Sequence, residues 1–209
     1  MANRVNFQRE MDALIEKNTR EGVIPTLLLH SCCAPCSSYV IEYLSKYFKI
    51  TVFYYNPNLY PDNEYDKRSA EQKRFISNYD ASNPVSFIEV GFNPNEFYQK
   101  IKGFENEKEG GARCEKCFEL RLEKTAELAL EKGFDYYATT LTISPMKNAE
   151  LINAVGSSIA QDIGVRYLAS DFKKKNGFNR STELSKEYGL YRQDYCGCIF
   201  SKKEREKMI

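Results

Sequence analysis

The chain has 209 residues, of which 42% are hydrophobic and 28% are charged, and this balance excludes a disordered polypeptide and allows one sizeable core. Its 30 Lys and Arg residues nearly cancel its 29 Asp and Glu residues, so overall charge does not indicate a nucleic-acid or membrane surface. The first 20 residues are polar and mixed in charge, and no segment approaches the roughly 20 apolar residues that cross a bilayer. We therefore expect a cytoplasmic protein that does not act at a membrane.

From Pro25 onward the sequence alternates between short apolar runs and segments with helical periodicity, after a helical or polar N-terminal extension over residues 1–24. The apolar runs predict five strands, at residues 26–31, 50–56, 86–92, 135–144 and 165–170. Helical spacing predicts six helices after the extension, at residues 37–47, 63–78, 95–102, 113–133, 148–164 and 181–188. Gly133 stands where a glycine is expected to end a helix.

This order of elements predicts an α/β, Rossmann-like fold with a parallel sheet and helices on both faces. No internal repeat or boundary divides residues 25–209, which we expect to form a single catalytic α/β domain with a cysteine-bearing C-terminal segment. Ligands of such sheets bind beyond the carboxyl ends of the strands. Cys32, Cys33 and Cys36 directly follow the first predicted strand, so they fall at this edge.

Seven cysteines occur in three clusters, CCAPC at 32–36, CEKC at 114–117 and CGC at 196–198. Cytosolic thiols are kept reduced, so clustered cysteines there usually bind metal or carry out redox chemistry. A Cys-x-x-Cys pair at a turn or helix start presents two thiolates to one metal or cluster. The dipole of the helix that begins near Cys114 also favours thiolate over thiol. Two such clusters would complete a four-sulfur site.

Other interpretations of the cysteines stay open. A buried cysteine often serves only as a small hydrophobic residue. A structural zinc site uses four ligands and leaves three of the seven cysteines unexplained, and a thioredoxin-type protein uses a single Cys-x-x-Cys pair after its strand. In the CGC cluster, cysteines two residues apart either close a strained, reducible disulfide bond or chelate a metal.

Five motifs in chain order resemble the cobalamin-independent epoxyqueuosine reductases. They are LLLHSCCAPCS (27–37), YYNPNLYPDNEYDKR (54–68), ARCEKCFELRL (112–122), TTLTISPMKNAELIN (139–153) and the segment 172–201. The resemblance covers nearly all of the chain after residue 24, and it implies a fold similar to the adenine nucleotide α-hydrolase-like, HUP-type sheet. It also implies reduction of epoxyqueuosine to queuosine at the wobble position of tRNA, the final step of queuosine biosynthesis.

The resemblance further implies roles for the cysteines by position. A [4Fe-4S] cluster is the implied cofactor, and its implied ligands are Cys32, Cys33, Cys114 and Cys117. Cys196 and Cys198 correspond to a redox-active pair, and Cys36 stands where an additional metal ion is expected near the cluster. No nucleotide cofactor is expected, because cysteines occupy the place of the phosphate-binding loop and neither GxxxxGK nor GxGxxG occurs.

Removing an epoxide oxygen takes two electrons and two protons, whereas a [4Fe-4S] cluster usually moves one electron at a time. One hypothesis places a mononuclear iron on Cys36 with Cys196 or Cys198, as a Lewis acid at the epoxide oxygen. The rival hypothesis makes Cys196 and Cys198 a dithiol reductant. Both need an electron donor that the sequence does not identify. Candidate proton donors are His30, for which a structural role is favoured, Tyr60, Asp194 and Tyr195.

A tRNA substrate requires positive charge and aromatic faces near the site. Residues 166–209 carry 11 Lys and Arg against 6 Asp and Glu, and FKKKNGFNR at 172–180 interleaves basic and aromatic residues. Lys173, Lys174 and Lys175 are candidates for phosphate contacts, although a charged run is most often a solvated face. Tyr54, Tyr55 and Tyr60 of the second motif are candidates for stacking on an extruded base, although tyrosines after a strand more often cap the core.

Three alternative functions are kept. A zinc-dependent RNA-binding module would be colourless and would hold stoichiometric zinc. A tRNA thiolation enzyme of the same fold would need ATP and a phosphate-binding loop after the first strand. A general thiol oxidoreductase would leave Cys114 and Cys117 without a use.

Overall fold

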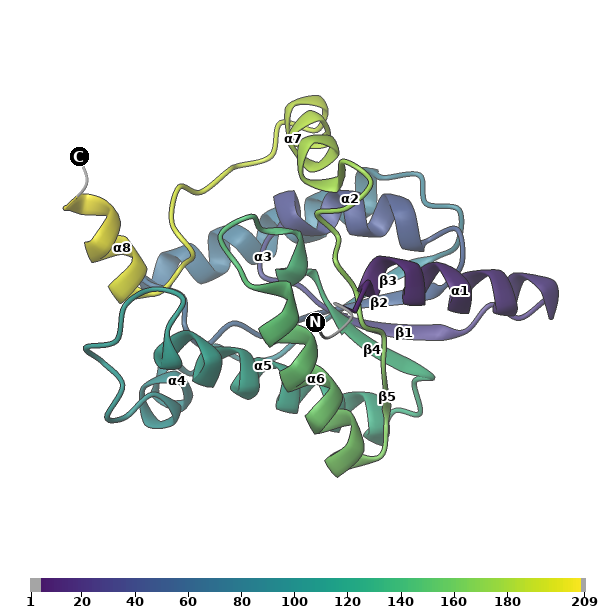
Figure 1. Ribbon diagram of the computed structural model, residues 1–209. Helices are drawn as coiled ribbons and strands as arrows, with labels where there is room; N and C mark the ends of the chain where they lie inside the picture. The colour runs from purple at the N-terminus through teal and green to yellow at the C-terminus, as the bar shows by residue number, and fades with distance from the viewer. Residues whose placement is uncertain (1–4, 208–209) are drawn as a thin grey trace.

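The computed structural model describes residues 5–207 and contains one five-stranded parallel sheet with helices on both faces (Figure 1). Residues 1–4 of the expected N-terminal extension and residues 208–209 lie outside the described part. The strands are β1 (Thr26–His30), β2 (Lys49–Tyr54), β3 (Val85–Glu89), β4 (Tyr136–Thr139) and β5 (Arg166–Tyr167). The helices are α1 (Phe7–Arg20), α2 (Ala34–Leu44), α3 (Asp62–Asn78), α4 (Pro94–Lys100), α5 (Ala112–Glu131), the 3₁₀ helix η1 (Thr140–Ile143), α6 (Ala149–Ile163), α7 (Gly177–Glu187) and α8 (Ile199–Glu206).

The strand order is β3-β2-β1-β4-β5. The chain therefore adds β2 and β3 on one side of β1 and then adds β4 and β5 on the other side. Leu29 of β1 pairs with Val52 of β2 and with Ala138 of β4. The order of winding therefore reverses between β1 and β4. In open parallel sheets, the loops that leave the carboxyl ends of two such strands diverge and create a ligand-binding crevice.

The side chains of β1 alternate between two cores, as the period of a strand requires. Leu27 and Leu29 are fully buried in a core that α1, α2 and α7 also line, whereas Leu28 is buried on the other face with residues of α5 and α6. Burying each leucine contributes about 2 kcal/mol. Helices thus cover both faces of the sheet, and the predicted fold class is confirmed (Figure 1).

The first helix of the sheet begins earlier than its periodicity predicts, and this changes the setting of two cysteines. α2 starts at Ala34 rather than at residue 37, because Pro35 fits the first turn, where its missing N–H costs nothing. Cys33 consequently occupies the N-cap position, and Cys36 lies within the first turn of the helix.

The fourth strand is shorter than predicted and ends at Thr139. The Thr139 hydroxyl accepts a hydrogen bond from the Leu141 backbone N–H, which turns the buried TLTI segment into η1. The chain end also differs, because the charged residues after Cys198 form α8. Its few apolar residues give a weak helical pattern in the sequence.

The helix α1 packs on the sheet through an apolar stripe that contains Met11 and Ile15. Its N-cap, Asn6, accepts a hydrogen bond from the Arg9 backbone N–H. Gly133 adopts a positive φ directly after α5, as the sequence predicts. Among residues 5–207, no helix combines the length and apolar character that crossing a bilayer requires.

Candidate metal and redox site

The first cysteine cluster lies where β1 leaves the sheet. The sulfur atoms of Cys32, Cys33 and Cys36 lie within 4.8 Å of one another, and Cys32 and Cys33 are buried. Neighbouring side chains on an extended chain usually point to opposite sides. Here the sulfurs of Cys32 and Cys33 nevertheless converge to 3.8 Å, and α2 brings Cys36 back toward them. These three thiols form a donor set suited to a metal ion.

Hydrogen bonds among the three sulfurs move their pKa values apart. The pKa of Cys32 lies well below its ordinary value because Cys33 and Cys36 donate S–H hydrogen bonds to its thiolate. The same bond to Cys32 raises the pKa of Cys33 to about 12, and the pKa of Cys36 also lies well above its ordinary value. A bound metal cation would replace the protons of Cys33 and Cys36, as happens when thiols become ligands.

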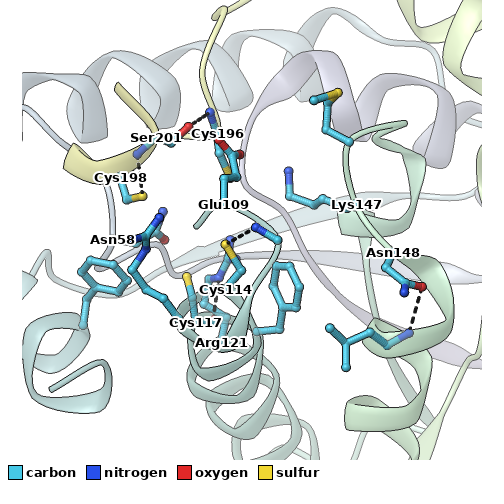
Figure 2. A pocket seen from close by; sticks show the side chains of 16 residues that line it. Asn58, Glu109, Cys114, Cys117, Arg121, Lys147, Asn148, Cys196, Cys198 and Ser201 are labelled. Carbon is cyan, nitrogen blue, oxygen red and sulfur yellow. Dashed lines mark hydrogen bonds between the residues drawn. The ribbon is translucent and has the colours of Figure 1, made fainter. Parts of the chain in front are cut away.

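The second cluster lies in the first turns of α5, where Cys114 and Cys117 point into a common cavity (Figure 2). The Gly110 backbone N–H donates to the sulfur of Cys114 at 3.2 Å. Burial raises the pKa of Cys114, and it raises the pKa of Cys117 to about 12. Burial therefore outweighs the helix dipole that the sequence suggests, and these thiols need a nearby cation to become thiolates.

The third cluster, Cys196 and Cys198, lies across the same cavity from α5 (Figure 2). Gly197 between them has a φ of 133°, and a Cβ atom there would lie 2.5 Å from Cδ2 of Leu59. Ser201 accepts a hydrogen bond from the Cys196 N–H and donates its own N–H to the sulfur of Cys198. All seven cysteines are free thiols.

Two connected hollows join the three clusters. A cavity of about 110 Å³ is lined by four cysteines, Cys114, Cys117, Cys196 and Cys198. An open groove of about 290 Å³ is lined by Cys32, Cys36 and Cys196. Cys196 faces both hollows. Of the four cysteines that the resemblance assigns to a cluster, Cys114 and Cys117 line the cavity, Cys32 lines the groove, and Cys33 is buried beside Cys32. In the described part of the chain only the Cys32, Cys33 and Cys36 sulfurs gather within 4.8 Å.

Buried guanidinium groups face these thiols. Arg121 is 1% exposed, and its Nε donates a hydrogen bond to the carbonyl oxygen of Cys117. Within residues 5–207, its Nη2 has no hydrogen-bond partner and the side chain forms no salt bridge. Burial lowers the pKa of Arg121, but attraction to the sulfurs of Cys117, Cys196 and Cys32 in their ionised forms outweighs burial, so the pKa of Arg121 is raised. A buried charge without a counter-charge is costly. The site therefore favours an anionic group, and a thiolate-bound metal centre fits.

Arg68 differs from Arg121 because a carboxylate accompanies it. Arg68 is 1% exposed, and its Nε lies 2.7 Å from Oε1 of Glu64. Its Nη1 donates to the carbonyl oxygen of Cys196 at 3.4 Å. The Arg68 side chain thereby positions the loop that carries Cys196 and Cys198.

Three charged residues of the site were not identified from the sequence. Arg121 lies one helical turn after Cys117, so its place on α5 was available from the spacing. Lys147 follows β4, on the strand edge where a ligand is expected, and it lines both hollows. No local sequence pattern indicates a site role for Arg68, because only the tertiary structure brings α3 to the Cys196 loop.

The favoured structural role of His30 agrees with its environment. The ring is fully buried, with Nδ1 2.9 Å from Oγ1 of Thr139 and Nε2 3.3 Å from the carbonyl oxygen of Tyr55. Burial lowers the pKa of His30 to about 3. The imidazole is therefore neutral and holds β1, β2 and β4 together.

Two of the tyrosines proposed to stack on a base do not reach the site surface. Tyr54 is fully buried and its hydroxyl donates to the carbonyl oxygen of Tyr65, and Tyr55 is buried and donates to Glu96. The stacking role expected for Tyr54 and Tyr55 is wrong, because both side chains belong to the core. Tyr60 remains partly exposed.

The three lysines of the basic run differ in their contacts. Nζ of Lys173 lies 3.1 Å from Asp171, and Nζ of Lys175 lies 2.8 Å from Asp12. The exposed ammonium of Lys174 has neither a salt bridge nor a hydrogen bond to any residue the structure describes. Lys174 is therefore the one of the three whose charge is free to meet a phosphate.

Comparison with known proteins supports the same kind of chemistry. The sequence profile of the family described as epoxyqueuosine reductase QueH matches residues 27–204. The chain is 46% identical over 202 residues to epoxyqueuosine reductase QueH of Streptococcus pyogenes serotype M1, covering 96% of this chain and 79% of that protein. It is 42% identical over 202 residues to the protein of that name from Staphylococcus aureus strain Mu50, covering 95% of this chain and 84% of that protein. It is 36% identical over 186 residues to the protein of that name from Thermotoga maritima, covering 87% of this chain and 93% of that protein.

Replacing Arg121 by Met is expected to affect the metal-free and metal-loaded proteins in opposite directions. Without metal, the change removes a buried charge that lacks a carboxylate, so the free energy of unfolding rises by about 1–3 kcal/mol. With metal, the change removes positive charge beside the thiolates, so metal is lost faster to a chelator. Anaerobic urea unfolding and metal retention after dialysis measure the two effects.

Arg9→Met is the matched control, because Arg9 is exposed on α1. The R9M variant should change neither the free energy of unfolding nor the metal retained after dialysis. An R121M protein that is less stable without metal and retains metal as well as the wild type would contradict the assignment of Arg121 as counter-charge.

Proposed function

The chain belongs to the epoxyqueuosine reductase QueH family, and on that basis we propose that it reduces epoxyqueuosine at the wobble position of tRNA to queuosine, the final step of queuosine biosynthesis. The observation that carries the proposal is the meeting of three cysteine clusters at the carboxyl edge of β1 and β4. The family match spans all seven of these cysteines. Residues 25–209 would form the catalytic domain, and the tRNA substrate would place the activity in the cytoplasm.

We propose a [4Fe-4S] cluster as the cofactor, with Cys32, Cys33, Cys114 and Cys117 as its ligands. Two properties of the chain support it. The sulfurs come from the exit of β1 and the start of α5. Cys32, Cys114 and Cys117 line two hollows that share Cys196, and Cys33 lies 3.8 Å from Cys32. Arg121 supplies buried positive charge, which suits an anionic thiolate-bound cluster. When bound, such a cluster supplies one-electron transfers.

Cys36 is the proposed ligand of an additional metal ion, a mononuclear iron. Its sulfur lies within 4.8 Å of those of Cys32 and Cys33, and it lines the open groove together with Cys196. Cys198 lines the inner cavity instead. If one of the CGC pair joins Cys36 on a metal, the geometry favours Cys196 over Cys198.

The alternative role for Cys196 and Cys198 is a redox-active dithiol. Burial raises the pKa of Cys198 to about 11, although the Ser201 N–H opposes this. Cys196 is half-buried at the groove and is the more accessible sulfur. In this role Cys196 would attack first, and Gly197 would allow the tight turn that a bond to Cys198 needs. Both roles require an external electron donor.

The open groove is the proposed entrance for the tRNA base. Phe178 and Tyr195 line it, and the Arg192 guanidinium lies 5.5 Å from the Phe178 ring. Aromatic and guanidinium faces stack on unpaired bases. Lys174 lines a neighbouring hollow with Lys147 and is proposed to contact a tRNA phosphate.

Anaerobic incubation with tRNA that contains epoxyqueuosine, in the presence of a chemical reductant, is expected to yield queuosine on nucleoside analysis. The reconstituted protein should be brown, with absorbance near 400 nm. A colourless protein with stoichiometric zinc and no product would overturn the function and favour an RNA-binding module. The Cys117→Ser variant is the inactive control, because it removes one proposed cluster ligand.

Iron counting in the Cys36→Ala variant tests the additional metal. Wild-type protein reconstituted anaerobically should bind one iron per chain beyond the four of the cluster, and C36A should lose that iron and at least about tenfold in activity. Cys36→Asp should recover part of both, because a carboxylate also binds iron. A wild-type preparation with four irons, no further metal and full activity would favour the dithiol role.

Salt dependence distinguishes Lys174 from its neighbour Lys175. Lys174→Gln should weaken tRNA binding and lower the slope of log K against log salt by about 1, because one phosphate contact is lost. Lys175→Gln is the matched control, since Lys175 pairs with Asp12, and its slope should not change. Fluorescence anisotropy of labelled tRNA at several salt concentrations measures both, and equal slopes for the two variants would count against Lys174.

A further inference from the structure

Lys147 occupies a fixed position at the centre of the crevice between β1 and β4. It lies in the turn between η1 and α6, where its backbone N–H donates to the carbonyl oxygen of Ser144 at 3.2 Å. The next residue, Asn148, caps α6 by accepting hydrogen bonds from the N–H groups of Glu150 and Leu151. The backbone on both sides of Lys147 is thus held by hydrogen bonds.

The ammonium group of Lys147 has no counter-charge. Its side chain is half-buried, yet Nζ makes no salt bridge or hydrogen bond with any residue between 5 and 207. Lys173 and Lys175, by contrast, each pair with an aspartate. Holding a lysine partly buried without a partner is unfavourable unless a ligand supplies one.

Lys147 is also the residue that all three hollows share. It lines the inner cavity with Cys196 and Cys198, the open groove with Cys32 and Cys36, and a third hollow of about 530 Å³ with Lys174. In Figure 2 its side chain extends from the start of α6 toward Cys196. A substrate bound in the open groove would therefore lie beside Lys147 as well as beside the thiols.

The ammonium form of Lys147 is favoured beside ionised sulfurs. Burial lowers its pKa, but attraction to the sulfurs of Cys196, Cys32 and Cys36 in their ionised forms outweighs burial, and the pKa lies above its ordinary value. Lys147 is therefore protonated at neutral pH. An alkoxide is about as basic as hydroxide and is a much stronger base than an amine, so proton transfer from the ammonium to an alkoxide is favourable.

The donors suggested by the sequence are less suited to this role. His30 is buried and neutral, with both ring nitrogens engaged. The Tyr195 hydroxyl donates its proton to the carbonyl oxygen of Tyr60 at 2.6 Å. Asp194 is exposed and faces Arg205 at 4.0 Å. Tyr60 lines none of the three hollows.

We propose that Lys147 is a catalytic residue that gives a proton to the oxygen leaving the epoxide. This inference rests on the proposed reductase function. The overall reaction breaks both C–O bonds, forms a C=C bond and releases the oxygen as water, with two electrons from the reductant that the reductase uses and two protons. Lys147 protonates the alkoxide formed when the first C–O bond breaks. The second proton comes from water in the open groove, which also reprotonates Lys147.

Three variants test the role, in protein reconstituted anaerobically with its metal centre. Lys147→Met should lower kcat about 10²- to 10⁴-fold while the Kd for tRNA and the iron content stay at wild-type values. Lys147→Gln repeats the test with a polar side chain, in case K147M folds poorly. Lys147→Arg keeps the charge but holds its proton too tightly to donate it, so its kcat should also be low. Lys46→Met, at an exposed position just after α2, is the control.

The outcomes separate this inference from the proposed function. Wild-type protein that makes no queuosine overturns the function itself. With an active wild type, unchanged kcat in K147M or K147Q overturns the role of Lys147. A rise in tRNA Kd with a smaller salt slope and normal kcat would make Lys147 a phosphate contact instead. Full kcat in K147R would show that charge alone suffices, which also contradicts proton donation.

Discussion

The buried guanidinium of Arg121 among the sulfur atoms is the constraint on which the site depends. None of residues 5–207 places a carboxylate on Arg121, so negative charge on the sulfurs of Cys117, Cys196 and Cys32 would stabilise its buried guanidinium. Burial raises the pKa of Cys117 and so favours its neutral thiol. A thiolate-bound metal centre would meet both demands, because a metal displaces thiol protons and the resulting thiolates neutralise the arginine. The strands and helices bring these groups together from three separate regions of the chain.

Arg68 shows how the same residue type serves a different purpose when its charge is neutralised. Its salt bridge with Glu64 supplies a counter-charge, although the sulfurs of Cys33 and Cys32 also raise the pKa of Arg68. Its Nη1 holds the backbone of the Cys196 loop. The space beside it is filled, since a Cβ atom at Gly197 would lie 3.1 Å from Nη1. The loop is therefore positioned by packing and hydrogen bonds.

Sequence reasoning succeeded where a local pattern carries the information. Alternating and helical periodicities predicted the sheet and its covering helices, and spacing predicted the cysteine clusters. It failed where tertiary contacts decide the outcome. Tyr54 ends β2 and Tyr55 directly follows it, and the sequence there is the same whether these side chains face a ligand or the core. Equally, nothing in the run of three lysines reveals that Asp12 and Asp171 pair with two of them. The sequence did not identify Lys147 as a site residue, because a single lysine in a turn forms no motif or periodic pattern.

The sheet order explains how the thiols and the proposed proton donor Lys147 can lie at one site without forming a salt bridge. The thiols enter from the exit of β1, from α5 and from the C-terminal loop, whereas Lys147 enters from the exit of β4. Because β1 and β4 are neighbours at the point where winding reverses, their loops diverge and leave a groove between them. A lysine salt-bridged to a thiolate would lose its capacity to act on a substrate. Separation across the groove keeps the ammonium free until an oxygen enters between the two sides.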